Sequence, residues 1–286
     1  MATDLAAHRI VLFGGWNGTS YLGDTWEYDG VNWTESTTPG PRARAQHALA
    51  YDEARGATVL FGGVFAPGQS GYLGDTWQYA SGAWTQLTSA ALPPRRFDHA
   101  MVHDKKRDRI VMFGGRGSSG ASLMNDTWEW DGSNWTLARP VTSPTPRVGH
   151  ALAFDPVSGS VILFGGIQLG GPIVGDMWSW DGTNWTQLHP AHAPSARWHA
   201  VMASDPGDGH VVLHGGNDGV ALTDTWTWDG ADWTSIWTRT QPPGSVLPAI
   251  TTGIDGRHVV LFGGEDATGT LRAETWWFGK LPRRGH

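Results

Sequence analysis

The sequence contains no cysteine, which excludes a disulfide framework, a thiolate metal site and a cysteine nucleophile. No apolar run approaches the roughly 18 residues that a membrane-spanning helix needs, and no segment shows helical periodicity. We therefore expect no membrane partner. The first ten residues do not combine a basic segment with an apolar core, so we expect a cytoplasmic protein if the chain is complete.

Lysine is scarce, and negative charge is in excess. Of the 20 lysines and arginines only Lys105, Lys106 and Lys280 are lysines, and the formal net charge at pH 7 is -7. Binding of nucleic-acid phosphates depends on an excess of positive charge, so we expect no nucleic-acid partner. Arginine is suited to bidentate recognition of carboxylates, which makes the positions of the arginines informative.

An internal repeat runs through the whole chain. A β-branched run that ends in two glycines recurs six times, at residues 10–15, 58–63, 110–115, 161–166, 211–216 and 259–264. After each copy an acidic residue stands two positions before a tryptophan; these acidic residues are Asp24, Asp75, Asp126, Asp176, Asp224 and Glu274. Periods of this length are typical of solenoids, propellers and other repeat architectures.

Each repeat predicts four short strands, here named a, b, c and d, because β-branched and aromatic runs are bounded by Gly, Asp, Asn and Pro. Strands c and d are joined by Asp-Gly at 29–30, 131–132, 181–182 and 229–230, and we interpret these aspartates as turn formers. A four-stranded unit with two apolar faces can bury them only against its neighbours. We predict an all-β chain that forms one six-bladed β-propeller of four-stranded antiparallel blades.

Three features of the repeats resemble the kelch family: the double glycine that ends strand b, an aromatic residue in strand c and, in five of the six repeats, a tryptophan that opens strand d. The resemblance covers the whole chain and implies the same propeller. Kelch domains serve as enzymes, adaptors and structural parts, so the resemblance leaves the function open.

The two ends of the chain are expected to meet. Residues 282–286 are similar to the opening of strand a at 146–150, and residues 1–4 would continue that strand. We predict that the termini share one blade, which closes the ring, and that the last blade has three strands. The predicted blades of this single domain are residues 1–37 with 282–286, 41–88, 94–138, 146–188, 196–237 and 243–279.

One face of the predicted propeller carries the longer and more variable loops. Alternating strand direction places the b-to-c and d-to-a connections on this face, called here the b–c face, and variable loops on a rigid scaffold favour binding. The a-to-b and c-to-d turns lie on the opposite face, called here the a–b face. The b–c face also collects arginines, including Arg42 and Arg95.

Five of these arginines open strand a: Arg44, Arg96, Arg147, Arg197 and Arg283. The resemblance implies that arginines at this position contact the ligand, as they do in kelch adaptor domains that bind acidic peptides. The alternative is that they form structural ion pairs with the acidic residues that open strand c, because a buried arginine needs a partner.

Histidines recur in strand a as well, at His47, His99 and His150, with His199 shifted by one position. A zinc site needs three or four ligands around one ion, and equivalent positions on separate blades are too far apart. We therefore expect no metal ion and no cofactor, and we keep these three recurrent histidines as candidate ligand contacts near the channel.

No catalytic residues can be assigned. Galactose oxidase-like kelch enzymes need a cysteine, which is missing, and the Glu, Asp and His spacing of nitrile-specifier proteins is not found. We expect a monomeric, non-catalytic scaffold that presents an arginine-rich channel mouth to an acidic peptide, a protein or a small anion. The alternative is a carbohydrate-binding or carbohydrate-active propeller that uses Trp16, Tyr21 and Trp198.

Overall fold

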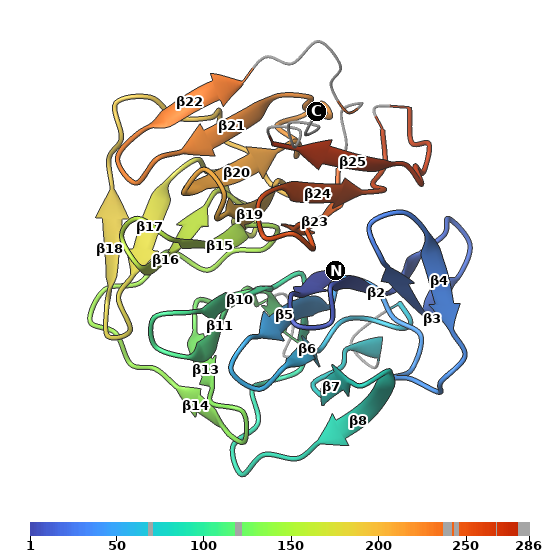
Figure 1. Cartoon of the computed structure of the whole chain (residues 1–286). Coiled ribbons are helices and arrows are strands. Elements are labelled where there is room, and N and C mark those ends of the chain that lie inside the picture. Colours follow the sequence, from blue (N-terminus) through green and yellow to red (C-terminus); the bar gives the residue numbers. More distant parts are fainter. Residues whose placement is uncertain (68–70, 118–121, 237–241, 243–245, 267, 280–286) are drawn as a thin grey trace.

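The computed structural model describes residues 1–67, 71–117, 122–236, 242, 246–266 and 268–279 (Figure 1). They form a six-bladed β-propeller of antiparallel sheets, as the sequence predicts, with the blades arranged around a central axis. Within this described part, no helix is long and apolar enough to cross a membrane.

Blade 1 consists of β1 (Ala2–Asp4), β2 (Arg9–Trp16), β3 (Tyr21–Tyr28) and β4 (Trp33–Ser36). Blade 2 consists of β5 (Ala48–Asp52), β6 (Ala57–Phe61), β7 (Thr76–Ala80) and β8 (Ala83–Leu87). Blade 3 consists of β10 (Ala100–Asp104), β11 (Arg109–Phe113), β13 (Thr127–Trp130) and β14 (Trp135–Leu137), beside a two-stranded pair of β9 (Arg96–Phe97) and β12 (Arg116–Gly117).

Blade 4 consists of β15 (Ala151–Asp155), β16 (Ser160–Phe164), β17 (Met177–Trp180) and β18 (Trp185–Leu188). Blade 5 consists of β19 (Val201–Asp205), β20 (His210–His214), β21 (Thr225–Trp228) and β22 (Trp233–Ile236). The described residues of blade 6 form three strands, β23 (Ala249–Thr252), β24 (Val259–Phe262) and β25 (Thr275–Phe278).

The hydrophobic core lies between the blades. All five residues of β6 are buried, because strand b is covered by neighbouring blades on both faces; all of them except Thr58 are apolar. One core cluster combines Phe164 and Met177 of blade 4 with Met202, Trp228 and Trp233 of blade 5. Each blade thus stabilises the next.

In blades 1 to 5, a hydrogen bond from the tryptophan that opens strand d crosses the interface with the preceding blade, which for blade 1 is blade 6. The indole Nε1 of Trp185 donates to Thr127 Oγ1 of the preceding blade at 2.9 Å, and Trp84, Trp135 and Trp33 donate in the same way. At blade 5 the acceptor is the sulfur of Met177, 3.3 Å from Trp233 Nε1, because methionine replaces threonine there.

The N-terminal residues form strand a of blade 1, as predicted. In β1, Ala2 pairs with Val11, and Thr3 Oγ1 lies 2.9 Å from Thr251 Oγ1 of blade 6. Residues 282–286, which the prediction placed in the same blade, lie outside the described residues, as does Arg283.

A cavity of about 120 Å³ lies at the centre of the ring. Its walls are largely apolar and come from the innermost strand of every blade, with Ala50, Met101, Ala153 and Met202 among them. Residues of the a-to-b turns and His103 also line the cavity, which therefore lies toward the a–b face.

Candidate functional site

The four described arginines that open strand a are buried in their own blades. Arg44, Arg96, Arg147 and Arg197 have side chains that are at most 1% exposed. Arg147 is representative: its Nη1 lies 2.6 Å from Asp176 Oδ1 and its Nη2 lies 2.8 Å from Asp176 Oδ2. The corresponding pairs are Arg44 with Asp75, Arg96 with Asp126 and Arg197 with Asp224.

The remaining donors of these guanidinium groups are also used. In Arg147, Nε donates to the carbonyl of Thr145, Nη1 also donates to the carbonyl of Gly165, and Nη2 also donates to Thr145 Oγ1. All five N–H groups of Arg147 therefore have acceptors within the protein. This geometry supports the structural ion-pair interpretation, and ligand contact by these arginines remains a prediction.

Three of the paired aspartates, Asp75, Asp176 and Asp224, have a lowered pKa. Desolvation acts to raise the pKa of Asp176, but hydrogen bonds from Arg147 and from the indole of Trp178 outweigh it and lower the pKa. The pKa of Asp75 and that of Asp224 are lowered by the same balance. Each arginine–aspartate ion pair thus links the start of strand a to the start of strand c on the b–c face of its blade.

The recurrent histidines are packing residues in this structure. The rings of His47, His99 and His150 lie 5.3–5.6 Å from phenylalanine rings of the preceding blade in edge contacts, His150 against Phe113. Burial, together with the positive charge of Arg147, lowers the pKa of His150 to about 3. Neutral imidazoles at these positions give the channel no positive charge.

Backbone hydrogen bonds narrow the channel at the b–c face. Asp98 N donates to the carbonyl of Gln46, Gly149 N to that of Asp98, and His199 N to that of Gly149. The side chain of His199 passes over Gly149, and its Nε2 lies 3.0 Å from both carboxylate oxygens of Asp98. Blades 3 and 5 are thereby joined across the mouth.

A second group of arginines remains accessible on the loops of blades 2 and 3. Arg42 and Arg95 are exposed and Arg116 is half-buried, and among the described residues none of the three has a carboxylate partner. The Arg42 guanidinium lies 3.5 Å from the centre of the Phe65 ring. We call Arg42, Arg95 and Arg116 the blade 2–3 arginines.

The loops that carry the blade 2–3 arginines contact one another. The rings of Tyr72 in blade 2 and Phe97 in blade 3 lie 4.7 Å apart, and Phe97 pairs with Arg116 in the β9–β12 ladder. The backbone and Cγ of Arg95 pack over Gly74 of blade 2. The Nε of Arg116 is buried without a hydrogen-bond partner in the described part of the chain.

The aromatic candidates do not form one platform. Trp16 is 47% exposed, and its ring lies 4.9 Å from that of Tyr21 on the adjacent strand of blade 1. Trp198 belongs to blade 5, where its ring stacks on His199 at 4.1 Å. The structure therefore brings together Trp16 and Tyr21.

On the a–b face of several blades, a residue at the end of strand a or one position before it forms a contact to the preceding blade. Tyr51 Oη donates to Asp4, Ser204 Oγ to the carbonyl of Phe154, and Thr252 Oγ1 to the carbonyl of Ser204. In blade 3 this position is His103, whose Nε2 faces Asp52 of blade 2 and Asp108 of its own turn. This cluster was not predicted from the sequence. The signal that could have indicated it is a histidine at a repeat position where the other blades have hydroxyl or aromatic residues.

Comparison with known proteins shows to which family the chain belongs. A family model described as the KLHDC2/KLHL20/DRC7 Kelch-repeats domain matches residues 78–264. The chain belongs to the kelch-repeat family. Kelch propellers are typically protein-interaction scaffolds.

Three relatives with which the chain was compared are longer proteins. The chain is 30% identical to the F-box/kelch-repeat protein At1g51550 of Arabidopsis thaliana, over 55% of this chain and 37% of that protein. It is 39% identical to the dynein regulatory complex subunit 7 of Chlamydomonas reinhardtii over 28% of this chain and 7% of that protein. It is 25% identical to the Mei4-dependent protein 6 of Schizosaccharomyces pombe over 55% of this chain and 26% of that protein. The chain thus spans about a third or less of the length of these relatives.

Proposed function

We propose that this kelch propeller is a non-catalytic interaction scaffold that binds an acidic peptide segment of a partner protein on its b–c face, through the blade 2–3 arginines. The observation that carries the proposal is the contrast between two sets of arginines. The buried set is bonded to aspartates of its own blade, whereas Arg42, Arg95 and Arg116 have no carboxylate partner among the described residues.

The surroundings of the three arginines support the same function. Arg42 lies over the Phe65 ring, which holds its guanidinium in one orientation and lowers the entropy lost on binding. The buried Nε of Arg116 lacks a hydrogen-bond acceptor among the described residues, and a carboxylate of the bound peptide would provide one. The local positive charge of these arginines favours acidic segments over other parts of a partner.

The relatives are compatible with a scaffold. Two of them, an F-box/kelch-repeat protein and a subunit of the dynein regulatory complex, have names that describe proteins with further parts or members of an assembly. A propeller that provides the binding face of a larger protein fits this arrangement.

The proposal is tested by binding of fluorescent acidic peptides to the protein and to a variant with Arg42, Arg95 and Arg116 all replaced by alanine. Exposed charge pairs contribute up to about 1 kcal/mol each, so we expect the triple variant to bind about tenfold or more weakly. Binding to the unmodified protein should weaken as salt is added. Arg139→Ala is the matched control, because Arg139 is an arginine of blade 3 outside this group.

The outcome that contradicts the proposal is an unchanged affinity in the triple variant, or an equal loss in Arg139→Ala. A second candidate function, carbohydrate binding, is favoured by the exposure of Trp16 beside Tyr21. Binding to a glycan array that is lost in Trp16→Ala, together with no binding of acidic peptides, would support that second function.

A further inference from the structure

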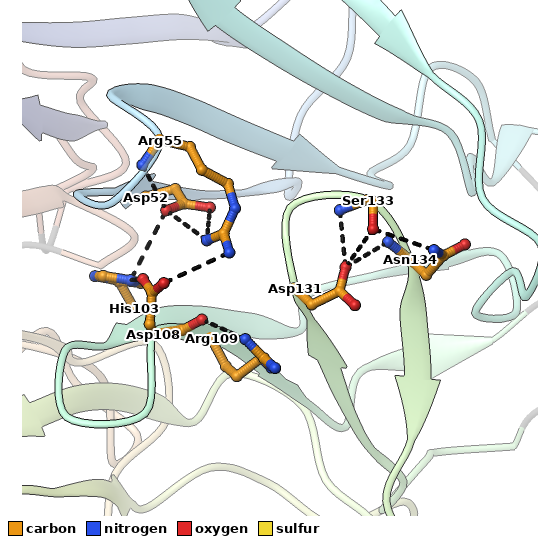
Figure 2. Close-up of polar contacts among 8 residues, drawn as sticks. All are labelled: Asp52, Arg55, His103, Asp108, Arg109, Asp131, Ser133 and Asn134. Atoms are coloured by element: carbon orange, nitrogen blue, oxygen red, sulfur yellow. Dashed lines mark hydrogen bonds and ion pairs between the residues drawn. The ribbon is translucent and has the colours of Figure 1, made fainter.

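Three potential metal ligands meet on the a–b face, between blades 2 and 3 (Figure 2). Asp52 ends β5, His103 lies in β10, and Asp108 lies in the turn that follows β10. The Nε2 atom of His103 lies 3.3 Å from Asp108 Oδ1 and 3.9 Å from Asp52 Oδ1. One ligand atom from each residue lies within 4.8 Å of the others.

The imidazole of His103 is directed into this cluster and is not a packing histidine like His150. Its side chain is only 7% exposed, and its Nε2 faces the two carboxylates. Its Nδ1 is buried and makes no hydrogen bond within the described residues. All polar contacts that the described residues make with this ring are therefore on the side of Asp52 and Asp108.

The spacing of the ligand atoms is close to that of a tetrahedral site. Ligand bonds of about 2.0–2.2 Å to zinc place neighbouring ligand atoms about 3.3–3.6 Å apart. The distances from His103 Nε2 are 3.3 Å to Asp108 and 3.9 Å to Asp52, so Asp108 already lies at this spacing and Asp52 lies slightly beyond it. Asp108 is 43% exposed, which leaves it free to rotate and leaves a path from solvent.

A positive charge already lies beside the two carboxylates. Arg55 Nη1 lies 3.0 Å from both oxygens of Asp52, and its Nη2 lies 3.5 Å from Asp108 Oδ2 (Figure 2). This guanidinium occupies the place beside the two carboxylates that a cation would take. The Arg55 side chain is 35% exposed, and it can move into solvent when a cation replaces it.

We propose that Asp52, His103 and Asp108 bind a divalent transition metal ion of the zinc type, with Arg55 as a displaceable competitor. One imidazole and two carboxylates suit Zn²⁺ or Co²⁺, whereas Mg²⁺ and Ca²⁺ prefer sites made only of oxygen. Three protein ligands leave a fourth position open for water or a further ligand. His103 also lines the axial cavity, so the site adjoins the space at the centre of the ring.

The experiment is a titration of the full chain, without an affinity tag and after treatment with a chelator, with Co²⁺ followed by its visible absorption, and then displacement by Zn²⁺. We expect one saturable site. Asp108→Asn keeps the shape of a half-exposed side chain but removes a charged ligand, and it should weaken Co²⁺ binding at least tenfold. His103→Gln should do the same.

Arg55→Gln is the deciding variant, because it removes no ligand. If Arg55 competes with the metal ion, its loss should tighten Co²⁺ binding about tenfold. A structural role of Arg55 in holding Asp52 predicts the opposite sign. His192→Ala is the matched control: His192 Nδ1 lies 2.7 Å from Asp232 Oδ2 in an exposed pair, and its removal should leave the site unchanged.

Absence of saturable Co²⁺ binding would overturn the proposal, as would unchanged binding in Asp108→Asn or unchanged or weaker binding in Arg55→Gln. Thermal unfolding of each variant shows whether it is folded. Should His103→Gln fail to fold, Asp108→Asn and Arg55→Gln still decide the question. The site lies on the face opposite to the blade 2–3 arginines, so peptide binding and metal binding are tested independently.

Discussion

The indole Nε1 of Trp33 in blade 1 donates a hydrogen bond to Thr275 Oγ1 in blade 6 at 3.1 Å. The bond that joins Trp185 to Thr127 between blades 4 and 3 has the same geometry, at 2.9 Å. The first and last blades are thus joined by the contact that joins interior blades. In the described part of the chain, side chains take part in ring closure together with β1.

Replacing the threonine acceptor with valine should destabilise an interior interface more than the closing one. In Thr127→Val the buried Trp185 Nε1 loses its partner, which costs about 1–3 kcal/mol of unfolding free energy. Thr275 and Trp33 are half-buried, so water can replace the lost acceptor and Thr275→Val should cost less than about 1 kcal/mol. Urea unfolding measures both, with exposed Thr136→Val as the control. Equal losses in the two variants would contradict this ranking.

The adjacent residues Arg95 and Arg96 should differ strongly in their effect on stability. Arg96 is buried and bonded to both oxygens of Asp126, so Arg96→Ala should lower the unfolding free energy by about 3–5 kcal/mol. Arg95 is exposed and has no carboxylate partner in the described residues, so Arg95→Ala should cost less than about 1 kcal/mol. Denaturant titration of the two variants gives the comparison. Similar values for both would show that Arg96 is not held by a buried pair.

Stability should fall as the pH falls toward 3, and His150 should account for part of the loss. Its pKa is about 3 in the folded protein because of burial, against about 6.5 in an unfolded chain. The unfolded chain therefore binds a proton that the folded protein excludes. Between these two pKa values the unfolding free energy should drop by up to about 1.4 kcal/mol per pH unit for this histidine, with no contribution above pH 6.5.

Urea unfolding at a series of pH values tests the histidine effect. His150→Leu should make the pH profile shallower between pH 3 and 6.5, whatever its effect on stability at pH 7. His192→Leu is the control, since His192 is exposed. Profiles of equal slope for the protein and His150→Leu would mean that His150 is not the titrating group.

The propeller was predictable because each repeat carries its own local signals. Strand b is β-branched and apolar, and Asp29 and Asp131 introduce the c-to-d turns, where each accepts backbone hydrogen bonds from the residues that follow. The sequence also predicted the pairing of Arg147 with Asp176 as one of two alternatives, because the arginine and the aspartate recur at the same positions of successive repeats.

The remaining features depend on how blades face one another, which local patterns do not encode. Gly132 belongs to a predicted turn, but its lack of a side chain also makes room for Arg55 of the neighbouring blade, whose Nε would lie 1.8 Å from a Cβ at this position. The cluster around His103 arises in the same way. Two turns of different blades must be placed side by side before Asp52 and Asp108 can be recognised as neighbours.

Gly149 is required at the channel mouth for two separable reasons. Its φ of 62° is in the left-handed region, which costs a residue with a side chain about 1–2 kcal/mol. A Cβ at this position would also lie 2.8 Å from Cδ2 of His199, whose side chain crosses to Asp98. Gly149→Ala should therefore lower the unfolding free energy by more than the backbone strain alone.

Gly209→Ala separates the two effects, because Gly209 has a φ of 71° and nothing lies within 4 Å of the point that a Cβ would occupy there. The unfolding free energy lost in Gly209→Ala measures backbone strain without a steric clash, and the loss in Gly149→Ala should be larger. If His199 is the obstacle, adding His199→Ala to Gly149→Ala should cost less than the sum of the two single changes in urea unfolding. Additive losses, or equal losses in Gly149→Ala and Gly209→Ala, would show that the side chain of His199 does not restrict this position.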